Sequence, residues 1–398
     1  MAMTIMPRKT STILGRRRSS LFCFLLGSSR RCVTTALKSS AVPVWFDSSN
    51  HLHWDNQYHP EQPERITACV KALSRESCVK LMDVADNPTS LLSTSSDDSS
   101  SSSIADNTKI ESTPFPTNAL QYAREILLQT HDPDLVTGLE KKCQLGRERR
   151  LAEGLDAVGH LGHIDLDTYV TTETWNVVLR ATATWIRAVD EALASTKPTM
   201  ALTRPPGHHA TRSESNGFCL FNFAPAAALH ALSQPTVQRV SILDWDVHYG
   251  QGVADIVRHH PRMRYVSTHQ VPAFPYMGES KGVQEGGNIL TLPMPADTTW
   301  TCGYQSLFDQ ALDFCVNDEW QPNLVIVCAG YDALSSDELA SCSLSAQDFG
   351  RMTRALRQRL PPQTALMLGL EGGYQLGDVG PSGNLPQAVV ETVRALAE

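Results

Sequence analysis

Short apolar runs recur along the second half of the chain, and each run ends in a cluster of polar residues. The runs are 200–203, 240–243, 324–328 and 365–370. Apolar runs of this length are typical of parallel strands that are buried on both faces. From residue 200 onward the runs alternate with segments of helical periodicity. This pattern predicts an α/β fold, with a mainly parallel, doubly wound sheet flanked by helices.

The first half of the chain is less regular. We expect an apolar strand to begin at 44–46 and a helix to cover 67–73. Ala, Leu, Val and Trp at helical spacing predict two more helices, over 119–128 and 173–193. The serine-rich segment 87–107 has too little apolar surface to fold, so it predicts a disordered insertion.

Residues 44–398 are expected to form a single catalytic domain, preceded by a leader over 1–43. The first 46 residues contain eight basic and no acidic residues and are rich in Ser and Thr. This composition matches an organellar transit peptide and predicts a mitochondrial or plastid protein. A secretory or two-step plastid signal and a basic tail with a nuclear address are the alternatives. The apolar run 21–26 is too short to span a bilayer.

Charge and cysteine content restrict the partners and the kind of metal site that the domain could have. Beyond the leader, 26 basic and 42 acidic residues give a net charge of −16, so the domain is a poor binder of nucleic acid. The ten cysteines form no Cys-x-x-Cys pair, and Cys219 and Cys328 lie in apolar sequence. We interpret the cysteines as reduced packing residues, so a metal site must use other ligands.

The polar clusters follow the ends of the predicted strands. They are His208-His209, Asp244-Trp-Asp-Val-His248, Asp332 and Glu371-Gly-Gly-Tyr374. Ligands of open α/β sheets bind beyond the carboxyl ends of the strands, so the four clusters should converge on one cleft. Each cluster alone could be a turn or a solvated loop, but their joint position at strand ends favours a catalytic site.

The second cluster is suited to a metal ion. Alternate residues of a strand share a face, so Asp244, Asp246 and His248 should project together while Trp245 and Val247 pack on the other face. Two carboxylates and an imidazole suit zinc with an open position, although ferrous iron, cobalt and manganese also fit.

We assign the metal to Asp246, His248 and Asp332, and expect Asp244 to orient a neighbouring histidine. His208 and His209 can act as the base, and Tyr374 on its Gly-Gly turn can donate to an oxyanion. These parts predict metal-assisted hydrolysis of an amide.

At these residues the sequence resembles the histone deacetylase superfamily, which shares the arginase-like α/β fold. Its Asp-Trp-Asp-Val-His and Glu-Gly-Gly-Tyr motifs are similar to those of the class II branch. The resemblance covers about 44–398. It is carried by eight segments, at 59–65, 130–136, 165–170, 204–210, 216–222, 244–252, 329–333 and 371–374.

The resemblance implies a role for each matching residue. Asp246, His248 and Asp332 match the zinc ligands, and Tyr374 matches the tyrosine that stabilises the transition state. His209 matches the general base, and His208, paired with Asp244, its electrostatic helper. Gln251 stands where the family places a shorter polar residue beside the base.

The resemblance also implies a substrate tunnel and a second ion. Phe218 and Tyr276 match the aromatic walls of the acyl-lysine tunnel, and Gly373 and Leu339 are expected to line it. A structural potassium ion would be held by the backbone carbonyls of three residues and by two further residues, namely Asp244, Asp246 and His248 with Ser267 and Thr268.

The expected function is a zinc-dependent deacetylase that releases acetate from N-acetyl-lysine in proteins. A polyamine-selective relative has a glutamate at the position of Leu339, so deacetylation of small acetylated amines is the first alternative. The second is an inactive zinc-bearing scaffold that binds acylated partners. The sequence leaves the acetylated substrate, the preferred acyl length and the oligomeric state open.

Overall fold

The computed structural model describes residues 41–54, 57–86 and 110–398. The predicted leader lies outside these residues except for its last three, and the predicted serine-rich insertion lies outside them entirely. Strand β1 already begins at Val42, so the domain starts slightly before residue 44.

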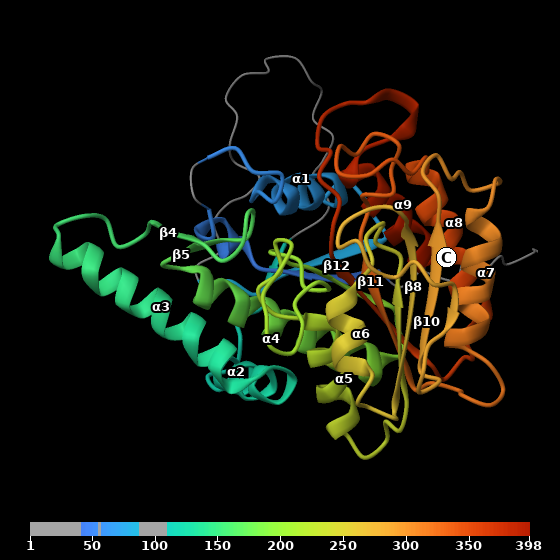
Figure 1. Ribbon diagram of the computed structural model, residues 1–398, viewed down its shortest axis with the longest axis horizontal. Coiled ribbons are helices and arrows are strands. Elements are labelled where there is room, and N and C mark those ends of the chain that lie inside the picture. Colours follow the sequence, from blue (N-terminus) through green and yellow to red (C-terminus); the bar gives the residue numbers. More distant parts are fainter. Residues whose placement is uncertain (1–40, 55–56, 87–109) are drawn as a thin grey trace, which may run out of the picture. The chain divides into compact units, whose positions relative to one another are not determined.

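Strands and helices alternate through the described part of the chain (Figure 1). The strands are β1 Val42–Phe46, β2 Val79–Asp83, β3 Glu111–Ser112, β4 His160–His163, β5 Tyr169–Thr171, β6 Thr199–Leu202, β7 Val240–Asp244, β8 Met263–Gln270, β9 Gly282–Val283, β10 Ile289–Met294, β11 Leu324–Ala329 and β12 Ala365–Leu370. The α-helices are α1 Glu64–Leu73, α2 Ala119–Thr130, α3 Pro133–Ala152, α4 Thr174–Ser195, α5 Phe223–Ser233, α6 Gln251–Val257, α7 Tyr304–Cys315, α8 Ala346–Arg359 and α9 Leu385–Ala397. Two 3₁₀ turns complete the set, η1 Ser48–Leu52 and η2 Gly380–Ser382.

One large sheet organises the domain, which confirms the predicted α/β class. Its strand order is β3-β2-β1-β6-β12-β11-β7-β8-β10-β9, and each neighbouring pair except β9–β10 is parallel. The four strands predicted from the apolar runs are β6, β12, β11 and β7, which lie side by side at its centre. Their carboxyl ends therefore share one edge of the sheet.

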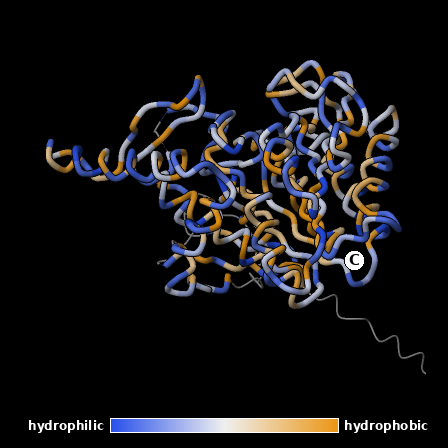
Figure 2. Tube along the Cα trace, turned by 60° about the horizontal axis from the view of Figure 1, so that its bottom comes forward, coloured by the Kyte–Doolittle hydropathy of each residue, from blue (hydrophilic) through white to orange (hydrophobic). Residues whose placement is uncertain are grey.

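Two helical layers cover the sheet. Successive side chains of a strand point to opposite faces, so each strand contributes to the core under both layers. On β11, Val325 and Val327 pack into the core beneath α1, α7, α8 and α9, whereas Ile326 packs into the core beneath α2 to α6. Figure 2 shows the hydrophobic positions concentrated along the strands and on the inner sides of these helices. Strands buried on both faces explain why the runs are apolar without interruption.

Three predicted helices are present as α1, α2 and α4, with ends that differ by a few residues. Helix α3 was not predicted, because only Val136, Leu139 and Cys143 of its side chains are buried. The remaining positions are mostly polar, so no apolar stripe marks the helix in the sequence. In the described residues, no helix combines the length and apolar character needed to cross a membrane.

Candidate active site

The loops that follow β6, β7, β11 and β12 bring the predicted polar clusters together. Strand β7 ends at Asp244, so the following residues lie in a turn rather than in a strand as predicted. The turn is held by the carboxylates themselves, because the Asp246 N–H donates to Asp244 Oδ1 (3.1 Å) and the His248 N–H donates to Asp246 Oδ1 (2.9 Å). Trp245 and Val247 still point into the hydrophobic core, so the predicted separation of polar and apolar side chains is kept.

Asp246, His248 and Asp332 form a compact cluster. One ligand atom from each lies within 4.8 Å of the others, and all three residues are buried. His248 Nδ1 is 3.2 Å from Asp246 Oδ1 and 3.1 Å from Asp332 Oδ2. A single point between these atoms is therefore accessible to all three donors.

Bare backbone surrounds the cluster on two sides. A Cβ atom at Gly330 would lie 2.0 Å from Asp246 Oδ2, and one at Gly372 would lie 2.1 Å from Asp332 Oδ2. The Gly372 N–H donates to Asp246 Oδ2 (2.8 Å), which fixes this carboxylate. Glycine is therefore needed at both positions for the carboxylates to approach each other.

The donor set fits a divalent cation. Burial and the neighbouring Asp246 raise the pKa of Asp332, because two carboxylates repel each other in a dry environment. Despite its burial, the two carboxylates raise the pKa of His248 well above its ordinary value. Carboxylate oxygen and imidazole nitrogen are both ligands that zinc accepts, and three protein ligands leave a fourth position open.

The surroundings of His208 favour its charged form. Its Nδ1 lies 3.2 Å from Asp244 Oδ2, and the Tyr265 hydroxyl donates to the same oxygen (2.8 Å). Although burial opposes it, the carboxylates of Asp246 and Asp244 raise the pKa of His208 to about 10. The predicted pairing of His208 with Asp244 is present, and the two carboxylates favour the protonated form of His208.

His209 is set up as a neutral base. Burial, followed by the charges of His208 and His248, lowers the pKa of His209 well below its ordinary value. The Gln251 amide donates from Nε2 to the His209 carbonyl (3.2 Å), which turns Oε1 towards His209 Nδ1 at 2.7 Å. The amide oxygen can only accept, so Nδ1 carries the proton and Nε2 keeps its lone pair.

Replacing Gln251 with aspartate should move the acidic limb of the kcat/KM profile to higher pH. A carboxylate stabilises the imidazolium of His209, so its pKa rises and a higher pH is needed to free the base. His208, His248 and Asp246, the other charged groups around His209, are unchanged. The check is a pH–rate profile with Gln251→Asn as the neutral control. An equal shift in the control, or a shift to lower pH, would contradict this role of Gln251.

Tyr374 is held by its backbone from two sides. The Asp337 carboxylate accepts from the N–H groups of Tyr374 (2.7 Å), Gln375 (3.3 Å) and Leu339 (3.1 Å). On the other side Arg65 donates from Nε to the Gly373 carbonyl (2.8 Å), and its guanidinium lies 4.6 Å from the centre of the Tyr374 ring. Burial raises the pKa of the Tyr374 hydroxyl well above its ordinary value, so it stays protonated and can donate.

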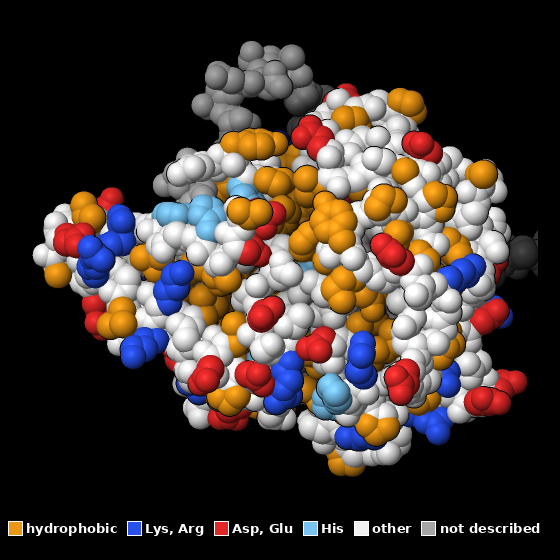
Figure 3. Space-filling model, viewed as in Figure 1, with side chains coloured by type: hydrophobic (Ala, Val, Ile, Leu, Met, Phe, Trp, Pro, Cys, Tyr) orange, Lys and Arg blue, Asp and Glu red, His pale blue; other side chains and the backbone are white. Residues whose placement is uncertain are grey.

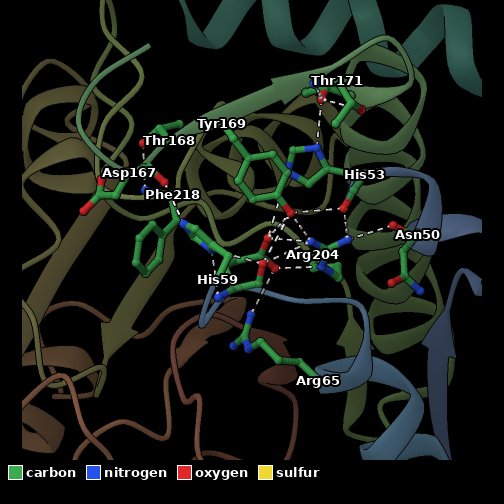
Figure 4. A network of polar contacts seen from close by, with 12 residues as sticks. Asn50, His53, His59, Arg65, Asp167, Thr168, Tyr169, Thr171, Arg204 and Phe218 are labelled. Atoms are coloured by element: carbon green, nitrogen blue, oxygen red, sulfur yellow. Dashed lines mark hydrogen bonds and ion pairs between the residues drawn. The ribbon is translucent and has the colours of Figure 1, made fainter. Parts of the chain in front are cut away.

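A buried ionic network supports this arrangement (Figure 4). Glu61 pairs with Arg204 through two short contacts, 2.7 Å to Nε and 2.6 Å to Nη2. Glu61 also lies 3.5 Å from Arg65 Nη1, and Arg204 donates to the Tyr169 hydroxyl (2.7 Å). The network therefore connects the first loop of the domain to the loop that carries Tyr374.

Glu371 joins two of the loops that form the candidate site. Its Oε2 accepts from the N–H groups of Gly207 (2.6 Å) and His208 (3.1 Å). Burial raises the pKa of this carboxyl to about 7. The loop that carries the two histidines is thus anchored to the loop that carries Tyr374.

Aromatic rings enclose the approach to the cluster. Phe218 lies against Tyr374, with ring centres 5.6 Å apart. Phe274, which the sequence did not single out, lies against His209 (4.8 Å) and His248 (6.4 Å). Tyr276 is 77% exposed, so the structure places Phe274 rather than Tyr276 beside His209 and His248.

The remaining predicted residues lie nearby. Leu339 is 39% exposed and lines a surface pocket together with Tyr374, and Gly373 precedes Tyr374 with a φ of 107°. Ser267 and Thr268 are buried, and the Thr268 hydroxyl lies 3.5 Å from the Asp244 carbonyl. The potassium ion and its five ligands stay a prediction.

The chain is similar to proteins of known family and fold. A family model described as the histone deacetylase domain matches residues 59–385. An uncharacterized protein of Synechocystis is 37% identical over 68% of this chain and 81% of its own length. The crystal structure of the HDA15 HD domain superposes with a TM-score of 0.66, covers 90% of this chain and 88% of its own, and is 23% identical, which supports the fold.

Two further relatives carry functional names. The protein named histone deacetylase 10, chloroplastic, of Oryza sativa is 32% identical over 67% of this chain and 59% of its own length. The protein named polyamine deacetylase HDAC10 of Danio rerio is 32% identical over 58% of this chain and 34% of its own length. The chain thus matches only part of each of these two proteins.

Proposed function

The chain belongs to the histone deacetylase family, and we propose that it is a zinc-dependent deacetylase acting on N-acetyl-lysine of proteins. The observation that carries the proposal is the buried Asp246–His248–Asp332 cluster, flanked by a neutral His209 and a fixed Tyr374. The test is release of acetate from an acetyl-lysine peptide by the purified, zinc-loaded protein. Absence of acetate with zinc bound would overturn the proposal.

Asp246, His248 and Asp332 would hold the zinc ion. When bound, zinc polarises the substrate carbonyl and lowers the pKa of a coordinated water. His209 Nε2 is free to take the proton of the attacking water, since Gln251 holds the Nδ1–H tautomer. Protonated His208 supplies positive charge nearby and does not compete for that proton.

Tyr374 would donate to the oxygen on which negative charge develops when the carbonyl is attacked. Its backbone contacts to Asp337 and its ring contact to Arg65 hold the hydroxyl in place before the reaction. Phe218 and Phe274 exclude water from the sides, which strengthens each electrostatic contact. His209 can return its proton to the leaving amine, which completes the hydrolysis.

Small acetylated amines are the second candidate substrates, supported by the similarity to a protein named polyamine deacetylase. Leu339 argues for acetyl-lysine, because an apolar side chain at the mouth offers no partner for a distant ammonium.

Leu339→Glu should therefore raise the kcat/KM ratio of N-acetylputrescine to an acetyl-lysine peptide, by about ten-fold at low ionic strength. Added salt should reduce the shift, because the new carboxylate is exposed. The ratio is measured for wild type, Leu339→Glu and the neutral control Leu339→Gln. An unchanged ratio in Leu339→Glu would show that another acidic group already sets the selectivity.

For the cellular location, we propose import into a plastid or mitochondrion. The proposal rests on the acid-free basic leader and on relatives named as chloroplastic in rice and in Arabidopsis thaliana. Imaging a fluorescent protein fused to residues 1–60 tests it, and a nuclear or cytosolic signal would refute it.

A further inference from the structure

A second pocket, of about 200 Å³, opens between helices α2, α4 and α5, and we call it the interhelical pocket. Among the described residues, its lining has no member in common with the pocket beside Tyr374. Around the hollowed centre of the face in Figure 3, hydrophobic side chains gather with acidic ones between them. The interhelical pocket differs from that surface, because both a basic and an acidic residue line it, Arg187 and Asp190. A ligand of different chemistry is therefore expected there.

Apolar and aromatic side chains form the inner walls of the interhelical pocket. Phe115 and Tyr122 contribute from the start of α2 and the residues before it, and Ala183 and Ile186 contribute from α4. Tyr122 packs against a small core cluster that contains Ile186, so this wall is part of the folded core. The volume is below the usual range for small-molecule pockets, which suits a ligand with one short apolar group.

A chain of hydrogen bonds fixes the polar side of the interhelical pocket. The Tyr122 hydroxyl lies 2.9 Å from His230 Nδ1, and His230 Nε2 lies 2.7 Å from Asp190 Oδ1. Gln234 donates from Nε2 to the same oxygen (3.1 Å). Side chains of all three helices are thus joined before anything binds, which lowers the entropic cost of binding. These contacts use Oδ1, and the Asp190 side chain is 44% exposed, so its other oxygen is accessible to a ligand.

Arg187 supplies the opposite charge. Arg187 and Asp190 are three residues apart on α4, so their side chains are neighbours on one face of the helix. In the described part of the chain, Arg187 forms no ion pair, and its guanidinium lies 5.1 Å from the centre of the Trp45 ring. Trp45 is buried, and its Nε1 likewise has no hydrogen-bond partner among these residues. Two donors without an acceptor therefore lie together on the Arg187 side of the pocket.

Neighbouring opposite charges beside an apolar hollow match a small zwitterion that carries an apolar group. We propose that the interhelical pocket binds a free α-amino acid with an apolar side chain, at a site separate from the proposed catalytic centre. The carboxylate of the ligand pairs with Arg187 and its ammonium group with Asp190. Its side chain packs on Phe115, Tyr122 and Ile186.

The experiment uses L-phenylalanine and L-leucine as probes, with three analogues that each lack one feature. Phenethylamine lacks the carboxylate, 3-phenylpropanoate lacks the ammonium group, and glycine lacks the apolar side chain. Binding to the purified full chain is followed by ligand-observed NMR. We expect the better of the two probes to bind with a Kd of about 1 mM, and the analogues to bind about five-fold more weakly or worse. Because binding is measured directly, the result does not depend on the proposed deacetylase function.

Three variants test the assignment of each feature. Arg187→Gln should abolish the preference for L-phenylalanine over phenethylamine. Asp190→Asn, whose Oδ1 can still accept from His230, should abolish the preference over 3-phenylpropanoate. Ala119→Leu keeps both charges and fills the pocket at the start of α2, so it should weaken binding of both probes by about ten-fold or more. Arg258→Gln, which changes an exposed arginine outside the pocket, is the control and should bind as wild type does.

Several results would overturn the proposal. One is the absence of binding by both probes at concentrations far above the expected Kd. Another is equal binding of L-phenylalanine and the two analogues that lack a charge. Preferences that persist in Arg187→Gln and Asp190→Asn would place the binding elsewhere on the molecule. Unchanged binding in an Ala119→Leu variant with a wild-type circular dichroism spectrum would do the same.

Discussion

Asp332→Ala is expected to lose bound zinc, from about one ion per chain to less than about a tenth, and with it all measurable deacetylation. The substitution removes one of three donors from a buried cluster in which each ligand atom lies within 4.8 Å of the others. Asp246→Ala should behave in the same way. Metal content by mass spectrometry and acetate release are the two measurements.

In these variants, loss of metal must be distinguished from loss of the folded structure. Asp332 Oδ1 accepts from the Val247 N–H (3.0 Å), so alanine also leaves a buried donor unpaired. Asp332→Asn keeps an acceptor for this N–H and serves as the second variant. Asp378→Ala, which removes an exposed carboxylate, is the control. Full metal retention in both Asp246→Ala and Asp332→Ala would refute the ligand assignment.

Tyr374→Phe is expected to lower kcat by on the order of 10²-fold or more, with little change in zinc content or peptide affinity. The hydroxyl contacts the carbonyl weakly in the ground state and strongly once the oxygen carries negative charge, so its loss affects turnover more than binding. Phenylalanine preserves the ring contacts with Phe218 and Arg65. Steady-state kinetics and calorimetry on an acetyl-lysine peptide are compared with wild type.

The same variant distinguishes an enzyme from a scaffold that only binds acylated partners. Equal turnover in wild type and Tyr374→Phe would exclude the proposed role of the hydroxyl. A wild-type protein that binds the peptide but releases no acetate with any metal or acyl group would favour the scaffold.

The core of the site could be predicted from the sequence because its residues follow strands. A buried parallel strand is recognisable from its apolar run, and its carboxyl end determines where the next residues lie. For this reason the sequence alone predicts that His208, Asp246, Asp332 and Tyr374 lie together. The turn after Asp244 was missed, because the carboxylates that stabilise it look like strand positions in the sequence.

Residues that act through loop backbone could not be found in this way. Asp337 holds Tyr374 by accepting from N–H groups, and every residue except proline provides such a group, so the sequence carries no pairing signal. Phe274 lies in a loop between strands, where no periodicity indicates which of two nearby aromatic rings turns inward. The pairing of Glu61 with Arg204 spans 143 positions and depends on the finished fold.

The position of β12 has a consequence for how the protein is made. This strand follows every other described strand in the sequence, yet it lies between β6 and β11 at the centre of the sheet. During synthesis β6 and β11 leave the ribosome before the strand that separates them has been made. Until β12 is made, both strands have an unpaired edge that is prone to wrong pairing. Tyr374, the proposed oxyanion donor, follows shortly after the strand that fills this place in the sheet. A chain that has not yet reached β12 therefore lacks both the continuous sheet and Tyr374, so this topology delays assembly of the candidate site until β12 and the residues after it have been made.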